Sequence, residues 1–188
     1  MQRRQLKGLF ADGPLTFRGA HYAITDLHGF PKPAQRPHPP ILIGGGNRRI
    51  LRLAGREANI VGLLTTSVAS GTVVDGPDER LAPAVEQKLA WVREGAGDRY
   101  PAIELSLIPS LILTDDRHGR AAQMIAERGW SGIAPEDVLA MPSVLLGTVE
   151  EITGDLFARR ERHGFSYYIV ADGQMEEFAP FVARLAGR

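Results

Sequence analysis

The stretch of residues 39–51 constrains the fold of this chain most, because a strand, a glycine turn and a helix start follow one another there. Residues 41–43 are a short apolar run behind two prolines, which is typical of a strand buried on both faces. Three glycines at 44–46 let the backbone turn tightly and let a ligand approach it closely. Because Asn47 is a favourable N-cap, the pattern predicts a strand that leads directly into a helix.

The predicted helix start is also a candidate phosphate site. The N–H groups of a helix start and the positive end of its dipole favour an anion. Arg48 and Arg49 add cationic donors, and because they oppose the helix dipole, a bound anion would relieve a local conflict. The alternative is a tight connection without a ligand. The stretch is neither a Walker A loop nor a dinucleotide fingerprint, since it lacks their endings and glycine spacing.

Composition argues against several classes of function. The chain has 22 Lys and Arg against 22 Asp and Glu, so no excess of positive charge favours nucleic acid as a partner. It has no cysteine, which rules out disulfides and thiolate metal sites. None of the 5 histidines pairs with an acidic residue at metal-ligand spacing, so no metal site is expected. Since no apolar run suits a membrane span or a signal peptide, a cytoplasmic protein is expected.

The first forty residues predict a small insertion rather than part of a sheet. Residues 1–11 show a short helical pattern, and two short strands at 15–17 and 21–24 flank a turn, which indicates a hairpin. Residues 29–40 contain five prolines and one glycine, so this segment is expected to be an extended loop.

The rest of the chain alternates between apolar strands and helices. Besides 41–43, apolar runs typical of buried strands occupy 58–63, 103–113 (with a break or bulge at Pro109) and 165–170. Helical patterns occupy 47–55, 78–94, 114–128, 135–140, 148–163 and 175–186, while 64–77 is interpreted as a loop and 141–147 as a linker. Three helix ends carry cap signals: Thr114-Asp115-Asp116 at one start, a capping box of Thr148 and Glu151 at another, and Gly164 after His163. This order predicts an α/β fold with about four parallel strands and outer helices.

Several polar residues of the last two elements have simple structural interpretations. His163 lies near a predicted helix end, where it is expected to interact favourably with the dipole. Residues 159–162 are expected to form a solvated helix face with i,i+4 ion pairs. Tyr167 and Tyr168 are expected to pack in the core on opposite faces of the last strand.

Three stretches in this order resemble a known family. The first runs from Leu6-Lys7-Gly8-Leu9 through Phe17-Arg18-Gly19-Ala20-His21-Tyr22. The second is residues 37–62, with the glycine turn and Leu53-Ala54-Gly55-Arg56-Glu57-Ala58-Asn59. The third is Leu146-Gly147-Thr148-Val149-Glu150-Glu151-Ile152 followed by Gly164-Phe165-Ser166-Tyr167-Tyr168. The chain thereby resembles the C-terminal half of a luciferase-like monooxygenase, in the branch that uses the deazaflavin coenzyme F-420. The resemblance implies the last four β-α units of a (β/α)8 TIM-barrel-like fold. We therefore expect a single domain, 1–188, with an insertion at 1–40 and the β-α units at 41–188.

The resemblance also implies a cofactor site but no catalytic residue. Family members place much of the flavin platform and the acid/base residues in the half that this chain is expected to lack, so the catalytic residues stay unknown. The implied cofactor is coenzyme F-420 (8-hydroxy-5-deazaflavin), with FMN as the alternative. The implied cofactor-binding residues are Gly44, Gly45, Gly46, Asn47, Arg48, Leu63 and Thr65.

Three functions are compatible with this sequence. The first is a flavin- or deazaflavin-dependent oxidoreductase, expected to be truncated, that transfers hydride to or from a small organic substrate or monooxygenates it. The second is a non-catalytic half-barrel, or a flavin-binding paralogue, that forms a homodimer through its open sheet edges. The third is an ordinary phosphate-binding α/β domain without a flavin.

Overall fold

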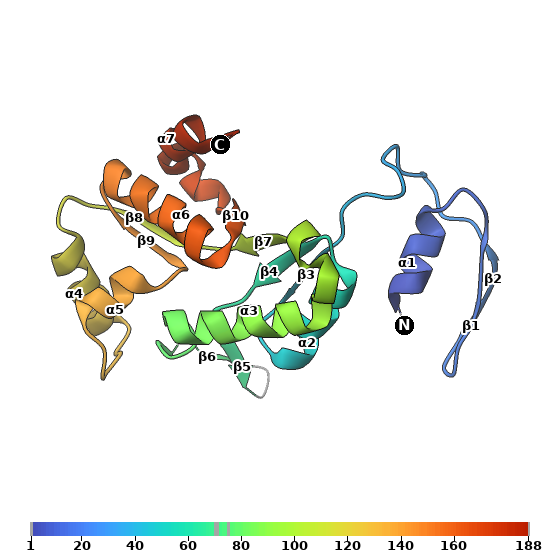
Figure 1. Cartoon of the computed structure of the whole chain (residues 1–188), viewed down its shortest axis with the longest axis horizontal. Coiled ribbons are helices and arrows are strands. Elements are labelled where there is room, and N and C mark those ends of the chain that lie inside the picture. The colour runs from blue at the N-terminus through green and yellow to red at the C-terminus, as the bar shows by residue number, and fades with distance from the viewer. Residues whose placement is uncertain (1, 70–71, 75, 188) are drawn as a thin grey trace. The chain divides into compact units, whose positions relative to one another are not determined.

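The computed structural model describes residues 2–69, 72–74 and 76–187. The chain divides into two compact units, Met1–Ile41 and Leu42–Arg188 (Figure 1). Each unit has its own packing and is described by itself. The expectation that they form a single domain stays a prediction.

The first unit is a helix and a hairpin followed by a proline-rich loop. Helix α1 (Gln2–Phe10) precedes the antiparallel strands β1 (Leu15–Arg18) and β2 (Ala23–Leu27). Lys32 holds the loop to the end of the helix, because its Nζ donates to the carbonyl oxygen of Leu9 at 3.0 Å. The predicted helix and hairpin are confirmed by α1, β1 and β2, although the ends of the strands differ from the prediction by a few residues.

The second unit contains the remaining helices and strands of the described residues. Its helices are α2 (Arg48–Glu57), α3 (Ala82–Ala96), α4 (Arg117–Glu127), α5 (Pro135–Ala140), α6 (Val149–His163) and α7 (Met175–Leu185), with 3-10 helices η1 (Gly97–Ala102) and η2 (Asp172–Gln174). Its strands are β3 (Leu42–Gly45), β4 (Ile60–Leu63), β5 (Ser67–Ala69), β6 (Thr72–Val74), β7 (Glu104–Leu107), β8 (Ser110–Leu113), β9 (Val144–Gly147) and β10 (Phe165–Tyr168).

A four-stranded parallel sheet forms the centre of this unit. Its strand order is β10-β7-β4-β3, and every neighbouring pair is parallel. Strands β8 and β9 form a separate parallel pair. The predicted α/β class with about four parallel strands and outer helices is confirmed, whereas the described strands do not close into a barrel.

The main core lies between one face of this sheet and the helices α2 and α3 (Figure 1). It contains buried apolar residues from both helices and from β4, β7 and β10. The two helices approach closely at two glycines: a Cβ on Gly55 would overlap the carbonyl of Val92, and a Cβ on Gly95 would overlap that of Arg52. Their close packing holds α3 across α2.

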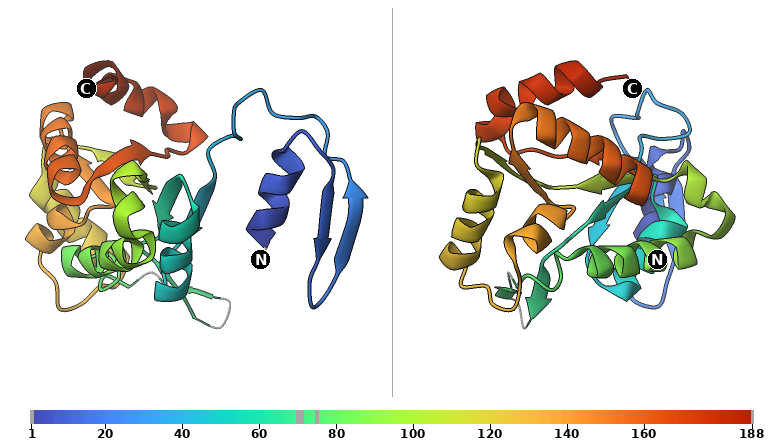
Figure 2. Two further views of the ribbon diagram at one scale, coloured as in Figure 1. Left: turned by 45° about the vertical axis from the view of Figure 1, so that its right-hand side comes forward. Right: turned by 60° about the vertical axis from the view of Figure 1, so that its left-hand side comes forward.

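Two smaller cores support the later elements. One contains residues of α4, α5 and β9, and the other contains residues of β8, β9, α6 and α7. Figure 2 shows α7 lying alongside α6, in agreement with their shared core. The sheet and its helices thus form a continuous layered arrangement within residues 42–188.

The predicted helix caps are confirmed. Asp116 Oδ1 accepts a hydrogen bond from the N–H of Gly119 at 2.9 Å at the start of α4. Thr148 and Glu151 form the predicted capping box at the start of α6. Gly164 ends α6 with a left-handed φ of 82°.

The prediction of one strand over 103–113 is wrong, although the predicted break at Pro109 is confirmed. The segment forms β7 and β8, which pair in different sheets. Proline lacks a backbone donor and cannot continue a ladder. Residues 141–147 are not a linker either, because β9 lies there and all four of its residues are buried. The preceding Met-Pro-Ser has the composition of a connection, which hid a strand of only four residues.

The prediction that residues 41–43 are buried on both faces is also wrong. Strand β3 is an edge of the sheet, and Leu42 is 42% exposed. Strand β10 is the opposite edge, so the buried strand predicted at 165–170 is shorter and only partly covered. Tyr168 packs against two cores as expected, whereas Tyr167 is 40% exposed and is not a core residue.

The segment 64–77 contains more structure than the predicted loop. Strands β5 and β6 pair antiparallel within it, while residues 70, 71 and 75 of the predicted loop lie outside the described residues. Helix α3 begins at Ala82, four residues after the predicted start, because residues 78–80 form a turn.

Arg159 corrects the prediction that residues 159–162 form a solvated helix face. Its side chain is buried, and its guanidinium donates to the carbonyl oxygens of Pro142 at 3.1 Å and Val144 at 2.6 Å. Asp155, one turn earlier on α6, lies 3.8 Å from the same guanidinium. The arginine therefore satisfies backbone carbonyls that lead into β9.

We predict that Arg159→Leu lowers the free energy of unfolding by about 3 kcal/mol, because two buried carbonyls lose a charged donor. The control is Arg162→Leu on the same helix, which breaks only an exposed ion pair with Glu86. This control should cost at most about 1 kcal/mol. Urea unfolding measures both variants, and equal losses would contradict the assignment.

His163 does not serve as a charged partner of the helix dipole. Its side chain is buried, and desolvation, assisted by the charge of Arg162, lowers its pKa below the usual 6.5. A neutral imidazole gains little from the dipole of α6. Burial therefore outweighs the dipole at this helix end.

We predict that His163 makes the chain less stable as the pH falls below about 6.5. The unfolded chain binds a proton there that the folded chain resists, so the stabilisation is present above the unfolded pKa and is lost toward acid. The free energy of unfolding should fall less between pH 7 and pH 5 in His163→Gln than in the unmodified chain. Parallel losses in both proteins would show that His163 does not cause the pH dependence.

Candidate functional site

A pocket of about 420 Å³ lies at the carboxyl ends of β3 and β4. We call it the glycine pocket. It is lined by Gly44, Gly45, Gly46, Asn47, Arg48, Ile50, Leu64, Thr66, Glu79 and Trp91. Five of the seven residues expected to bind a cofactor therefore line one cavity.

The start of α2 supplies the polar floor of the glycine pocket. Asn47 Oδ1 accepts a hydrogen bond from the N–H of Ile50 at 3.0 Å, so the predicted N-cap is confirmed. The N–H groups of Arg48 and Arg49 precede the first intrahelical bonds, and a helix start leaves such donors for water or a ligand. The dipole adds a partial positive charge at the same end. This arrangement suits an anion.

The three glycines of the turn differ in whether internal packing requires a glycine at their position. A Cβ on Gly45 would overlap the side chain of Ile50, and a Cβ on Gly46 would lie only 3.2 Å from the carbonyl oxygen of Leu64. Internal packing thus accounts for both. A Cβ on Gly44 would meet only the carbonyl oxygen of Gly62, at an ordinary 3.7 Å. Packing leaves Gly44 unexplained, and its missing side chain opens the pocket.

Arg48 already has a partner in the structure. Its guanidinium lies 3.2 Å from the carboxylate of Glu94, which Arg52 also approaches at 3.4 Å. The predicted conflict between Arg48 and the helix dipole is therefore reduced by a protein carboxylate. Arg48 therefore lines the pocket with a guanidinium that is already paired with the carboxylate of Glu94.

A buried ion pair that the sequence patterns above did not predict lies behind the pocket. Lys88 is 2% exposed, and its Nζ lies 2.6 Å from the carboxylate of Glu79, which lines the pocket. The same Nζ donates to the carbonyl oxygen of Leu64 at 2.9 Å. Lys88 interrupts the apolar stripe of α3 between Val85 and Leu89. A lysine at such a position is the sequence signal that indicates a buried and paired charge.

Leu63 and Thr65 are not part of the glycine pocket. Leu63 is buried in the main core and borders a second pocket, and Thr65 is buried as well. Thr66 lines the glycine pocket in the place where Thr65 was expected. The extended backbone after β4 makes neighbouring residues alternate, so a shift of one position changes the side that a residue faces.

The second pocket lies on the sheet face opposite the main core. We call it the sheet pocket; it measures about 80 Å³ and is lined by Leu42, Gly44, Gly62, Leu63, Leu64, Ser106, Leu107, Ile108 and Ile169. Gly44, Gly62 and Ser106 are aligned across β3, β4 and β7, so its floor carries almost no side chains. The Oγ of Ser106 is buried without a partner among the described residues. Gly44 and Leu64 line both pockets, so the two pockets adjoin at these residues.

Two classes of site find no support in the described part of the chain. No group of three or more His, Cys, Asp or Glu side chains there is placed to hold a metal ion. None of its helices is long and apolar enough to cross a membrane.

Sequence comparison identifies a family pattern in the first part of the chain. Residues 4–73 match the family model described as luciferase-like monooxygenase. A 56-residue segment is 42% identical to the FMNH(2)-dependent dimethylsulfone monooxygenase of Pseudomonas putida, and it covers 30% of this chain and 15% of that protein. Residues 4–73, which match the family model, include the hairpin and strand β3 at the glycine pocket.

Comparison with solved structures extends the similarity to nearly the whole chain. The coenzyme F-420-dependent tetrahydromethanopterin reductase from Methanopyrus kandleri aligns with 96% of the chain, at a TM-score of 0.65 and 14% identity. DmoA from Hyphomicrobium sulfonivorans aligns with 92%, at a TM-score of 0.57 and 14% identity. The chain covers 59% and 47% of the lengths of these two proteins. The resemblance to the luciferase-like monooxygenases is thus confirmed by the sequence pattern of residues 4–73 and by the fold.

Proposed function

We propose that this chain forms the phosphate-binding part of the cofactor site of a luciferase-like oxidoreductase that acts on a small organic substrate. The observation that carries the proposal is the opening at Gly44, where a strand end and a helix start meet and internal packing does not require a glycine. Strand ends followed by helix starts bind phosphates in α/β folds. The family pattern over residues 4–73 supports this choice.

The two adjoining pockets fit a phosphorylated ring cofactor. The glycine pocket would hold the phosphate at the N–H groups of α2, and the sheet pocket, at about 80 Å³, would contact one edge of a larger planar group. Its floor of two glycines and the buried hydroxyl of Ser106 offer a flat surface with one unsatisfied polar atom. When bound, a flavin or deazaflavin would supply hydride transfer, and reduced FMN also supports oxygen activation. The residues of this chain would orient the group and exclude water.

The charges around the glycine pocket favour coenzyme F-420 over FMN. FMN carries a phosphate monoester of about −1.5 to −2 charge at neutral pH, whereas the phosphate of F-420 is a diester with a single charge. Glu79 lines the pocket, and Arg48 shares its charge with Glu94. Because the arginine that lines the pocket is already paired with Glu94, a singly charged phosphate is the better partner, with FMN as the alternative.

We predict that the purified chain binds F-420 more tightly than FMN, and that Gly44→Ala weakens this binding at least about tenfold. The added methyl fits the fold, because it meets only the carbonyl of Gly62, but it occupies the opening. Titration of cofactor fluorescence measures the affinity. Emission from Trp91, which lines the pocket, gives a second readout.

Gly154→Ala is the matched control, because a Cβ there meets nothing within 4 Å and lies on α6. Its affinity should equal that of the unmodified chain. Gly45 is unsuitable for this test, since a Cβ there would collide with Ile50 and change the packing. If neither cofactor binds, the chain alone does not form a flavin site, and a phosphate-binding domain or a non-catalytic half-barrel becomes the better description.

A second candidate, a half-barrel that forms a homodimer, is favoured by the edges of the sheet. Strands β3 and β10 are its two ends, and Leu42 on β3 and Ile108 after β7 are 42% and 58% exposed. Unpaired strand edges beside exposed apolar side chains favour pairing with another chain. A second copy would satisfy both.

For this second candidate, we predict a dimer in light scattering at micromolar concentration, and a monomer for Leu42→Lys. A charge on the edge strand should prevent pairing. Val182→Lys on α7 changes a side chain that is 53% exposed and lies on a helix rather than on an edge strand, so it should remain dimeric. A monomer in the unmodified chain would exclude this candidate.

A further inference from the structure

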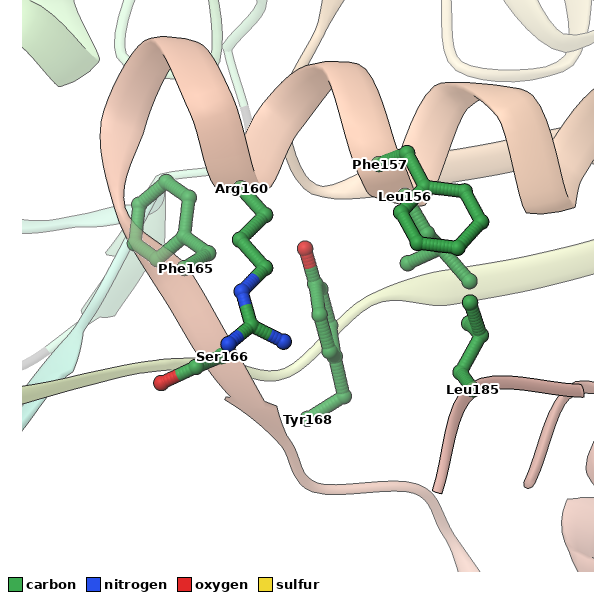
Figure 3. A pocket seen from close by; sticks show the side chains of 7 residues that line it. All are labelled: Leu156, Phe157, Arg160, Phe165, Ser166, Tyr168 and Leu185. Carbon is green, nitrogen blue, oxygen red and sulfur yellow. The ribbon is translucent and has the colours of Figure 1, made fainter. Parts of the chain in front are cut away.

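A third pocket lies on the helix-covered side of β10, and it shares no residue with the glycine pocket or the sheet pocket (Figure 3). We call it the tyrosine pocket. It measures about 90 Å³ and is lined by Leu156, Phe157 and Arg160 of α6, Phe165, Ser166 and Tyr168 of β10, and Leu185 of α7. It is therefore built within the second unit by three elements that pack together.

Tyr168 places an unsatisfied donor in this pocket. Its hydroxyl oxygen is buried and has no hydrogen-bond partner among the described residues. Burial raises the pKa of Tyr168 to about 12, so the hydroxyl keeps its proton at neutral pH and acts as a donor. In Figure 3 the ring stands on β10 with its hydroxyl directed toward α6. A buried hydroxyl without an acceptor costs free energy, which a ligand with an acceptor oxygen would recover.

The same pocket contains a cation. In Figure 3 the side chain of Arg160 extends from α6 toward β10 and lies alongside Tyr168. A guanidinium has five N–H donors, so it can take a carboxylate in addition to an existing partner. Buried Arg159 adds positive potential near the tyrosine, since its charge acts on the pKa of that hydroxyl. At this edge the carboxylate of Glu104 accepts a hydrogen bond from the Ser166 hydroxyl at 3.5 Å.

The apolar walls and the volume of the tyrosine pocket limit the apolar part of a ligand. Leu156 is 3% exposed and Phe165 is fully buried, while Phe157 at the rim is 40% exposed. At about 90 Å³ the tyrosine pocket has room for a ligand of a few heavy atoms, such as a short aliphatic chain with a polar head.

We propose that the tyrosine pocket binds a small aliphatic monocarboxylate of the size of butyrate. Its carboxylate would accept hydrogen bonds from the Tyr168 hydroxyl and from the guanidinium of Arg160. Its alkyl chain would pack against Leu156, Phe165 and Leu185. The combination of an unsatisfied hydroxyl, an arginine and apolar walls favours an anion with a short apolar body over a neutral alcohol, whose hydrogen bond to arginine is weaker, and over a cationic amine.

The test is a titration of the whole purified chain with butyrate, in which ligand-observed NMR measures the binding. Saturable binding at millimolar concentration is expected for butyrate, and n-butanol and n-butylamine should bind at least about tenfold more weakly. Tyr168→Phe and Arg160→Gln should each weaken butyrate binding about tenfold. Arg162→Gln, on the same helix but paired with Glu86, should leave it unchanged.

Absence of saturation, or equal affinity of the two pocket variants and the unmodified chain, would overturn the proposal. The melting temperature of Tyr168→Phe without butyrate gives an independent check. It should be unchanged or higher, because the variant removes an unsatisfied buried hydroxyl. A clear decrease would mean that the hydroxyl has an internal partner, and this result would also overturn the proposal. Gly44→Ala should not change butyrate binding, so the outcome is separate from that of the cofactor test.

Discussion

The packing of α2 and α3 against one face of the parallel sheet is the constraint on which the rest of the second unit depends. It requires glycines at 55 and 95, where a Cβ would overlap the backbone of the facing helix. It also places the start of α2 at the end of β3, and it brings Lys88 from α3 behind the same place. The glycine pocket is therefore a product of helix packing as much as of the glycine turn.

One-sided packing also explains what lies on the opposite face. The side chains that point toward α2 and α3 fill the main core, and the alternate positions contribute Leu42, Gly44, Gly62 and Ser106 to the sheet pocket. The structural relatives are longer than this chain, which covers 59% of the reductase and 47% of DmoA. Because this face carries apolar side chains and a buried unsatisfied hydroxyl, it is suited to contact with a ligand or a further protein surface.

The paired charges of this unit differ in how deeply they are buried. Arg159 is buried and donates to backbone carbonyls, whereas Arg162 on the same helix forms an exposed pair with Glu86. Lys88 is buried with Glu79 and a carbonyl, whereas Arg48 shares an exposed carboxylate. Burial makes the first member of each pair structurally important, because a buried charge without its partners is costly. Sequence position alone does not separate these cases.

The sequence by itself determined the helices and their alternation with apolar strands. The caps at Asp116, Thr148 and Gly164 and the helix pattern predicted the helices closely, because these signals act within a few residues. The alternation of strands and helices predicted a parallel sheet, and the motifs predicted the family resemblance and five residues of the glycine pocket.

Only the tertiary structure decided which residues are buried and which strands are neighbours. Strand β9 could not be predicted because four residues after a Met-Pro-Ser connection carry too little local signal. It pairs with β8, whose residues lie 34 positions earlier in the sequence. The buried states of Lys88, Arg159 and His163 depend on helices and strands distant in the sequence. Burial, edge position and ion pairing are set by long-range packing, and a pattern read along the chain contains only the local part of that information.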